Sequence, residues 1–454
     1  MIRNWTRRNF LRTGVAASAV AAGISQSSSA TWAQAAPPPG PPQGPPQGGP
    51  PQGGPPLGFP PAPPTPSGGS AAKENDIPVG ATIAINDLLD HGTGGHLKKG
   101  AKVLILAYVD GLYGGDNLVD RDAIHWIEQA VRQRGATPEV LWINEQPRFG
   151  EWTFPKVVQD AFARNDMVIN HSFNFTVEEI RAFNQYVETS PKYPMVRNFA
   201  TTAPLLCTAW AQTPQELVSE IRYQASLHIQ ANAKLVLSDP NGTHMEATVL
   251  APRGGTYATR REEGYFLPWP EWVVSPISLG DANGTVVFDR TLSWWSRYIG
   301  VPPVFEKPVL LKIEGGRIVK IEGGTEADAF RAFLQMLKDK EQAGNDAYLF
   351  NAMHFGVHPQ ARVAPHQCPS ALYRRLIEHS DSRNIHVHLG TIRGTKVFPY
   401  WPHITGDLRN ATLKIGDFVM HDNGRLTVLD DPAVAAIIAK YPGRPGIGPE
   451  PFEG

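Results

Sequence analysis

The chain of 454 residues has little cysteine, no surplus of charge of either sign and no long hydrophobic run. Its two cysteines, Cys207 and Cys368, exclude a disulfide framework, a cysteine zinc cluster and an iron–sulfur site within one chain. A formal net charge of −1 argues against a nucleic-acid partner. No glycine-rich phosphate loop follows the first predicted strand, so a nucleotide-binding fold has little support.

The N-terminus has the order of segments found in a twin-arginine signal peptide. Arg7 and Arg8 precede a small apolar run at residues 13–24, and Ala33 and Ala35 place small residues before a cleavage position. The run is shorter than the roughly 20 apolar residues of a membrane-spanning helix. We therefore predict a signal peptide at residues 1–35 and a periplasmic or extracellular protein that the twin-arginine machinery exports.

A segment dominated by Pro, Gly and Gln follows at residues 36–75. Such a composition cannot bury apolar surface, which predicts an extended, solvated linker. Its glycines do not recur strictly at every third position, which argues against a collagen triple helix. The rest of the chain is long enough for two domains.

The first part of the remaining chain, residues 76–231, alternates two hydrophobic patterns. Short β-branched runs predict strands at residues 101–107, 138–143 and 166–170. Amphipathic stretches predict helices at residues 119–134, 154–163, 177–187 and 214–231. Alternation of this kind is typical of a parallel sheet covered by helices, so we predict an α/β N-terminal domain.

The second part, residues 232–454, is richer in strand patterns. Apolar runs predict strands at residues 234–237, 284–288, 308–313 and 316–321. Gly315-Gly316 joins the last two runs and predicts a hairpin turn. A helix is expected at residues 326–338. We predict a β-rich (α+β) C-terminal domain that carries a metal site.

Histidine is concentrated in this second part. Eight of the fourteen histidines follow residue 350: His354, His358, His366, His379, His386, His388, His403 and His421. Histidine is the commonest metal ligand and the side chain most easily used for proton transfer near neutral pH. His386 and His388 lie two residues apart, a spacing that on a strand turns both imidazoles to one face.

Carboxylates near these histidines leave two kinds of metal site open. Asp407 follows His403 by four residues, and Glu271 lies in an aromatic stretch upstream. Two imidazoles with one carboxylate form the site of non-haem Fe(II) oxygenases. Carboxylate-richer sites are typical of two-metal hydrolases. Spacing alone does not choose between them.

One stretch resembles the aminopeptidase T family of metallopeptidases. It comprises Glu271, Ser275-Pro276 and the segment from Asp281 to Asp289, which includes Ala-Asn-Gly-Thr. That family pairs an α/β domain with a β-rich metal-bearing domain. The resemblance implies that Glu271 and His386 hold a metal.

Other motifs resemble the 2,5-dihydroxypyridine dioxygenase family, which shares that fold and opens a pyridine ring with one Fe(II). His403 lies five residues before Leu408-Arg409-Asn410, and Gly356-Val357-His358-Pro359 looks like a second motif of that family. The resemblance implies that His403 is a ligand. Where the family places its other ligands this chain has Ala352 and Thr405, and we take His354 and Asp407 as the nearest substitutes.

These patterns lead to a set of functional hypotheses. The first is a mononuclear Fe(II) ring-cleaving dioxygenase that acts on a small hydroxylated (hetero)aromatic substrate with O2, with His388 or His358 moving a proton. The second is an aminopeptidase or related hydrolase with one or two Zn or Co ions. The third is a non-catalytic exported binding protein. The candidate metal ligands are Glu271, His354, His386, His403 and Asp407. The sequence leaves open whether the chain forms a homo-oligomer.

Overall fold

The computed structural model of the protein describes residues 77–108, 119–143, 155–171, 195–198, 201–252, 255–259, 266–292, 295–296, 299–339, 344–365, 371–390 and 404–448. The predicted signal peptide at residues 1–35 and the predicted linker at residues 36–75 lie outside these ranges. His403 and the helix expected at residues 177–187 also lie outside them. Among the described helices, none combines the length and the apolar character needed to cross a membrane.

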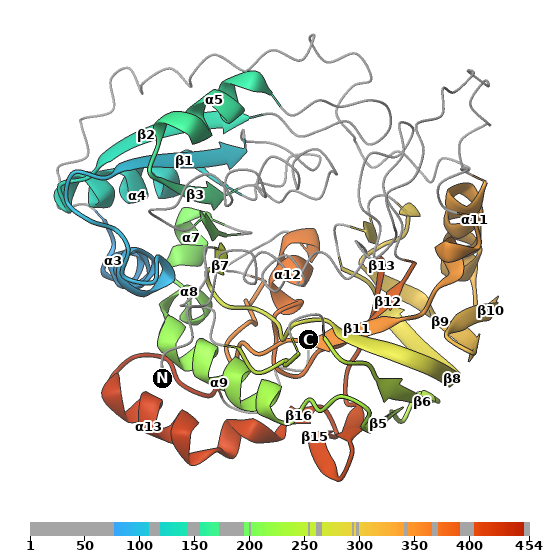
Figure 1. The fold of residues 1–454 in the computed structure, drawn as a ribbon. Coiled ribbons are helices and arrows are strands. Elements are labelled where there is room, and N and C mark those ends of the chain that lie inside the picture. Colours follow the sequence, from blue (N-terminus) through green and yellow to red (C-terminus); the bar gives the residue numbers. More distant parts are fainter. Residues whose placement is uncertain are drawn as a thin grey trace.

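A five-stranded parallel sheet forms one half of the fold (Figure 1). Its order is β2 (Thr137–Ile143), β1 (Lys102–Tyr108), β3 (Met167–His171), β4 (Met195–Arg197) and β7 (Phe266–Pro268). The parallel pairing of β1 with β2 and β3 confirms the predicted sheet. All five residues of β3 are buried, as expected for a strand with a neighbour on each side and helices on its faces.

Helices accompany this sheet. They are α3 (Val79–Asp87) with the π-helix Leu88–Gly92, α4 (Arg121–Gln133), α5 (Lys156–Arg164), α7 (Ala203–Leu206), α8 (Ala209–Gln212) and α9 (Gln215–Leu227). In α4 the side chain of Asp120 accepts a hydrogen bond from the Ala123 N–H at 2.8 Å and caps the first turn. Ile124, Ile127 and Val131 recur at helical spacing and are buried, which fixes the packed face of α4.

The other half of the fold is an 11-stranded antiparallel sheet. The hydrogen-bonded order of its strands begins with β11 (Ala352–Phe355), β12 (Ile385–Leu389), β13 (Ile404–Leu408) and β8 (Ile277–Arg290), and continues with β6 (His244–Val249), β5 (Lys234–Ser238), β14 (Thr412–Ile415), β15 (Phe418–Asp422) and β16 (Arg425–Leu426). A hairpin of β9 (Val304–Glu314) and β10 (Arg317–Glu322) joins it through β8. The turn between these two strands is the one predicted at Gly315-Gly316.

Helices of the second half are α11 (Thr325–Lys338), α12 (Ala371–Glu378) and α13 (Pro432–Lys440), with 3-10 turns at Gly344–Tyr348 and Thr427–Asp430. The helix predicted at residues 326–338 is therefore confirmed as α11. The structure as a whole is mixed α/β, with one parallel and one antiparallel sheet, as the sequence predicts.

Four strands of the antiparallel sheet close on themselves. The long strand β8 pairs with β11 near its start, through Ile277 and Ser278, and with β13 at its end, through Arg290. Since β11 also pairs with β12, and β12 with β13, the hydrogen-bonded path returns to β8. This closure holds β11 and β12 side by side, which positions the histidines described below.

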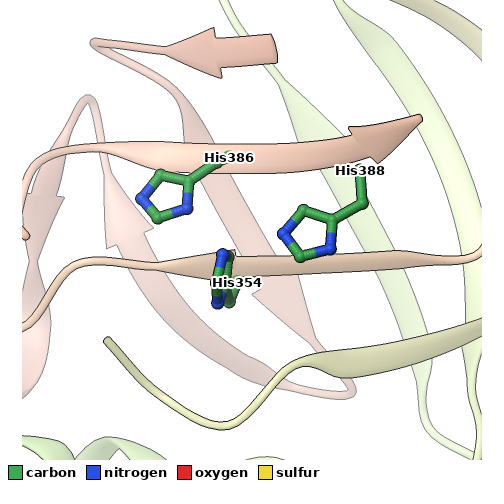
Figure 2. Close-up of side chains that lie close together, drawn as sticks. All are labelled: His354, His386 and His388. Atoms are coloured by element: carbon green, nitrogen blue, oxygen red, sulfur yellow. The ribbon is translucent and has the colours of Figure 1, made fainter. Parts of the chain in front are cut away.

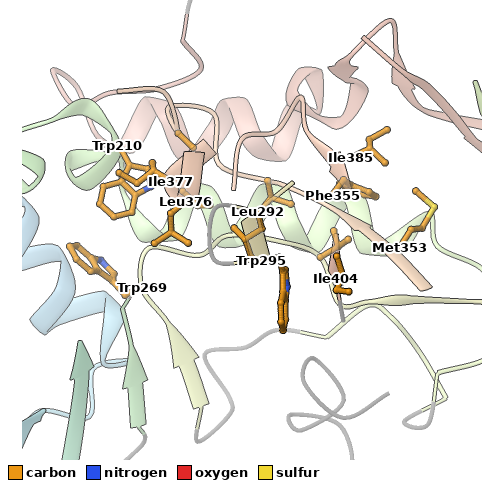
Figure 3. Packing of buried hydrophobic residues seen from close by; sticks show 14 of the residues in the cluster. Trp210, Trp269, Leu292, Trp295, Met353, Phe355, Leu376, Ile377, Ile385 and Ile404 are labelled. Atoms are coloured by element: carbon orange, nitrogen blue, oxygen red, sulfur yellow. The ribbon is translucent and has the colours of Figure 1, made fainter. Parts of the chain in front are cut away.

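The two sheets share one hydrophobic core. A single buried cluster includes residues of both halves, and Figure 3 shows part of it, with Trp269 and Trp210 near the parallel sheet and Phe355 and Ile385 on the antiparallel strands. The predicted domain boundary near residue 232 stays a prediction. Strand β7, although it follows that position in the chain, pairs with β4 in the parallel sheet.

Candidate metal centre

Three histidines come together on two neighbouring antiparallel strands. His386 and His388 lie two residues apart on β12, so both side chains project from the same face. His354 lies on β11 directly opposite His386, and Ala352 lies opposite His388. Residues opposite each other in an antiparallel pair share a face, so all three imidazoles lie on one side of the sheet (Figure 2).

The nitrogen atoms of these residues, which we call the histidine triad, converge on one another. One ring nitrogen from each lies within 4.8 Å of the other two. The His354 ring centroid is 4.4 Å from that of His386 and 4.4 Å from that of His388. All three residues are buried. In the part of the chain that the structure describes, this is the one group of three or more potential ligands gathered so closely.

A backbone carbonyl sets the protonation of His386. Its Nε2 lies 2.8 Å from the carbonyl oxygen of His379. A carbonyl can only accept, so Nε2 carries the proton and donates it. The buried Nδ1 has no hydrogen-bond partner among the described residues and keeps its lone pair. Burial, followed by repulsion from the His379 and His388 rings, holds the pKa of His386 well below its ordinary value, which favours the neutral, metal-binding form.

A fourth histidine, His379, supports the triad from the end of α12. Its ring stacks on the His386 ring with centroids 3.6 Å apart, and it lies 5.7 Å from the His354 ring. The sequence identified His379 only as a member of the histidine-rich stretch. No spacing signal links it to His386, because the contact depends on where α12 packs.

The structure places Asp407 beside the triad. It lies on β13 directly opposite His386 in the strand register. One carboxylate oxygen is 4.0 Å from Nδ1 of His379, and the Asn384 side-chain amide donates to the same oxygen at 3.5 Å. Asp407 therefore lies next to a residue that contacts the triad and is not one of the three convergent groups.

Glu271, the other carboxylate predicted as a ligand, lies in a buried ion pair. Its carboxylate oxygen is 3.3 Å from Nε of Arg222, and both side chains are almost completely buried. The Glu271 backbone N–H donates to the Gln215 side chain at 2.9 Å. The structure thus gives Glu271 a guanidinium counterion on α9, and it is not one of the three groups that form the triad.

The other histidines that the sequence predicts to function lie in different places. His388, which we expected to move a proton, belongs to the triad. His358 is fully buried outside the triad, where its Nδ1 accepts from the Gln360 N–H at 3.1 Å and its ring lies 6.2 Å from that of Trp210. Burial lowers the pKa of His358 to about 3. His403 lies outside the described residues and stays a predicted ligand.

Comparisons with known proteins agree with the resemblance predicted from the sequence. A family model described as 2,5-dihydroxypyridine 5,6-dioxygenase matches residues 201–374, a stretch that includes Glu271 and His354 and ends before His386. A search of curated proteins finds no significant match.

Two solved structures are similar to this chain to different degrees. The structure of 2,5-dihydroxypyridine dioxygenase from Pseudomonas putida KT2440 is 16% identical, covers 77% of this chain and 98% of that chain, and has a TM-score of 0.55. Wild-type AmpT from Thermus thermophilus is 12% identical, covers 77% of this chain and 99% of that chain, and has a TM-score of 0.43. At these identities the first structure supports the fold assignment and does not by itself transfer an activity.

Proposed function

We propose that the protein is a metal-dependent dioxygenase that binds one Fe(II) at the histidine triad and cleaves a small hydroxylated (hetero)aromatic ring. The observation that carries the proposal is the convergence of His354, His386 and His388, whose ring nitrogens lie within 4.8 Å of one another in a buried site. Imidazole suits iron, zinc, copper and nickel. The donor set therefore fits a transition-metal ion.

The surroundings of the triad favour metal binding over other uses of buried histidines. His386 presents an unprotonated Nδ1 while its Nε2 proton is held by the His379 carbonyl. Such an outer hydrogen bond fixes the ring orientation of a ligand. Fe(II), when bound, would supply open coordination positions for substrate oxygens and O2. Burial of the three side chains leaves them little contact with bulk water.

The comparisons support the proposed substrate class. The family model that matches residues 201–374 describes enzymes of dihydroxypyridine cleavage, and the similar fold from Pseudomonas putida is named for the same substrate. The triad consists of three imidazoles and has no carboxylate, whereas the ligands predicted from the sequence include Glu271 or Asp407 as a carboxylate. Asp407 and His403 remain proposed additional ligands.

The direct test is anaerobic loading of the protein with Fe(II), followed by measurement of iron content and of O2 uptake with 2,5-dihydroxypyridine. We expect one iron per chain and substrate-dependent O2 uptake. The variant His354→Ala should lose both, and the control variant His421→Gln should keep both, because His421 lies outside the triad. Iron binding without O2 uptake for any dihydroxylated pyridine or benzene would contradict the dioxygenase proposal.

A second function, a zinc- or cobalt-dependent aminopeptidase or related hydrolase, is favoured by one feature of the site. Three histidines without a carboxylate in the group form a known type of catalytic zinc site, in which the metal makes bound water acidic. Zn-loaded or Co-loaded protein should then release N-terminal residues from short peptides. Release that depends on His354, with no O2 uptake by the iron-loaded form, would favour this function.

We also propose that the protein is exported in folded form. This proposal rests on Arg7 and Arg8 and the apolar run that follows them. Cell fractionation of the full chain, compared with a variant carrying both Arg7→Lys and Arg8→Lys, tests it. Retention of the variant in the cytoplasm together with export of the parent chain is the expected result.

A further inference from the structure

The motif that begins at Gly356 resembles one in the dioxygenase family, yet its histidine, His358, lies outside the triad. Its backbone runs along the residues that join α12 to β12. The Gly356 N–H donates to the Asn384 carbonyl at 3.0 Å, and the His358 N–H donates to the Ser380 carbonyl at 2.8 Å. The Ser382 N–H donates back to the His358 carbonyl at 3.1 Å. Backbone hydrogen bonds in both directions therefore hold the motif against this connection.

Space, and not backbone conformation, explains the glycine at position 356. Its φ is not in the left-handed region, so φ does not require a glycine. A Cβ atom there would lie 2.5 Å from the Ser380 carbonyl oxygen and still closer to that of Asp381, whereas Cβ atoms essentially never come within 3.0 Å of such neighbours. Both neighbours are backbone atoms, which cannot rotate aside as the end of a side chain can. A larger residue must therefore push the two backbones apart.

The residues that Gly356 approaches form a buried turn, His379–Asn384, which we call the polar turn. All of its side chains except that of Arg383 are buried. The Asp381 carboxylate accepts a hydrogen bond from the Arg383 N–H at 2.9 Å. It also forms ion pairs with Arg383 at 3.1 Å and with Arg362 at 2.5 Å. A buried carboxylate with two guanidinium partners ties the turn together, because breaking either pair leaves a charge poorly compensated.

The polar turn leads directly into the strand that carries two triad residues. The His379 carbonyl accepts the Nε2 proton of His386 at 2.8 Å, and the two rings stack with centroids 3.6 Å apart. On the other side of the contact, Gly356 directly follows β11, which carries His354. The approach of Gly356 to the turn therefore joins the ends of both ligand-bearing strands, in addition to the β11–β12 pairing.

We propose that Gly356 and the polar turn are positioning elements of the metal centre. The close backbone contact at Gly356 holds the His379 carbonyl where it fixes the ring and the Nε2 proton of His386, which leaves Nδ1 for the metal. This inference rests on the proposed function, because the orientation of His386 serves a purpose only if the triad binds a metal. It also gives His358, which we expected to move a proton, a role carried by its backbone.

The first test is Gly356→Ala in the full chain. The added methyl group displaces the polar turn, so we expect the affinity for Zn or Fe(II), measured by competition with a chelator, to fall about 10–100-fold, as when an outer partner of a ligand is lost. Gly446→Ala is the matched control, because the nearest atoms there belong to the Ile438 side chain and lie 3.5 Å away. The control should bind metal like the parent chain. Circular dichroism checks that both variants are folded.

The second readout is the position of the proton on His386, which a loss of stability alone does not move. Nitrogen NMR of metal-free, histidine-labelled protein reports it, and the spectrum of His386→Ala identifies the resonances. The parent chain should show His386 protonated at Nε2, since that nitrogen donates to the His379 carbonyl. Gly356→Ala should show a mixture of the two tautomers. A parent chain protonated mainly at Nδ1 would overturn the proposal without any variant.

A milder variant serves if Gly356→Ala does not fold. Arg383→Gln removes one of the two guanidinium partners of Asp381 and keeps the other. It should loosen the polar turn, weaken metal binding by about threefold or more, and shift His386 toward mixed tautomers. The matched control is Arg164→Gln on α5, which removes the ion pair with Glu139 and should change neither readout.

The outcomes separate this positioning role from the proposed function. Parental metal affinity and a parental His386 tautomer in folded Gly356→Ala would overturn the role, even if the parent chain binds iron and consumes O2. Absence of metal binding by the parent chain would contradict the proposed function. In that case a change of tautomer in metal-free Gly356→Ala would still support control of His386 by the polar turn.

Discussion

Two sets of buried histidines in the C-terminal half differ in what their ring nitrogens face. His358 and His421 are as deeply buried as His386, and burial lowers their pKa values to about 3 and about 4. Nε2 of His421 bonds to the Ser382 carbonyl at 3.0 Å, much as Nε2 of His386 bonds to the His379 carbonyl, and Nδ1 of His358 accepts from a backbone N–H. Among the residues that the structure describes, neither belongs to a group of three convergent potential ligands.

The comparison shows that burial of a histidine is not enough to identify it as a metal ligand. The pKa of His386 is lowered, as are those of His358 and His421, so a low pKa alone does not identify a ligand. What distinguishes the triad is convergence, which comes from the register between β11 and β12. The buried groups outside the triad, among which we count His358, His421 and Glu271, should act on stability, and the triad should act on metal affinity.

The largest expected effect is the loss of folding stability in a variant of Glu271. The variant Glu271→Gln leaves the buried Arg222 without its counterion, which we expect to lower the free energy of unfolding by about 3–5 kcal/mol. Urea denaturation measures this change. The control Asp160→Asn removes an exposed pair with Lys156 and should change stability far less. Loss of bound metal without destabilisation would instead make Glu271 a ligand.

Next in size is the loss of metal affinity on removal of a triad residue. Removing a group that only orients a ligand weakens metal binding by about 10–100-fold, so His386→Ala, which removes a proposed ligand, should weaken it by more than about 100-fold. Competition with a chelator gives the affinity for Zn or Fe(II). The matched control is His421→Gln, which should bind metal like the parent chain. Equal losses in the two variants would contradict the assignment of the triad.

The pH dependence of folding stability tests the buried histidines outside the triad, of which His421 is one. His421 has a folded pKa of about 4 against an ordinary 6.5, so the unfolded chain binds more protons between these values. Stability should therefore fall as the pH drops below 6.5. From pH 7 to pH 5 the contribution of His421 to this loss is about 2 kcal/mol. Denaturation of His421→Gln at both pH values should show a loss smaller by that amount, and an unchanged loss would argue against a buried neutral His421.

The smallest effect is expected at Asp407. Because Asp407 lies beside the triad, opposite His386 and 4.0 Å from His379, and is not one of the three convergent groups, Asp407→Asn should weaken metal binding by only about tenfold. Competition with a chelator again measures the metal affinity. His386→Ala serves as the reference, because it shows the loss expected when a ligand is removed. A loss as large as that of the reference would place Asp407 among the ligands, as the sequence motif suggests.

Much of the secondary structure was predictable from local pattern. The strands at β1, β2 and β3 and the helices α4 and α11 follow from apolar periodicity, and the β9–β10 turn follows from Gly315-Gly316. The same local reasoning placed His386 and His388 on one strand face, because side chains alternate along any strand. The role of His403 was also inferred from a motif and stays a prediction.

Contacts between residues that lie far apart in the sequence were not predictable. Nothing in the chain near His354 specifies that it faces His386, since that contact depends on β11 lying beside β12. His379 meets the triad only because α12 ends against it. Glu271 fits a ligand motif in the sequence, whereas in the fold its carboxylate faces Arg222 on a helix some fifty residues earlier.

The sequence by itself determined which side chains are available for chemistry: many histidines, few cysteines and no surplus charge. It also determined the local elements that carry them, because propensity and periodicity act over a few residues. The tertiary structure decided which histidines converge and which carboxylate is already paired. The reason is physical: register between strands is set by burial of whole faces and by closure of the β8–β11–β12–β13 path, which no short segment encodes.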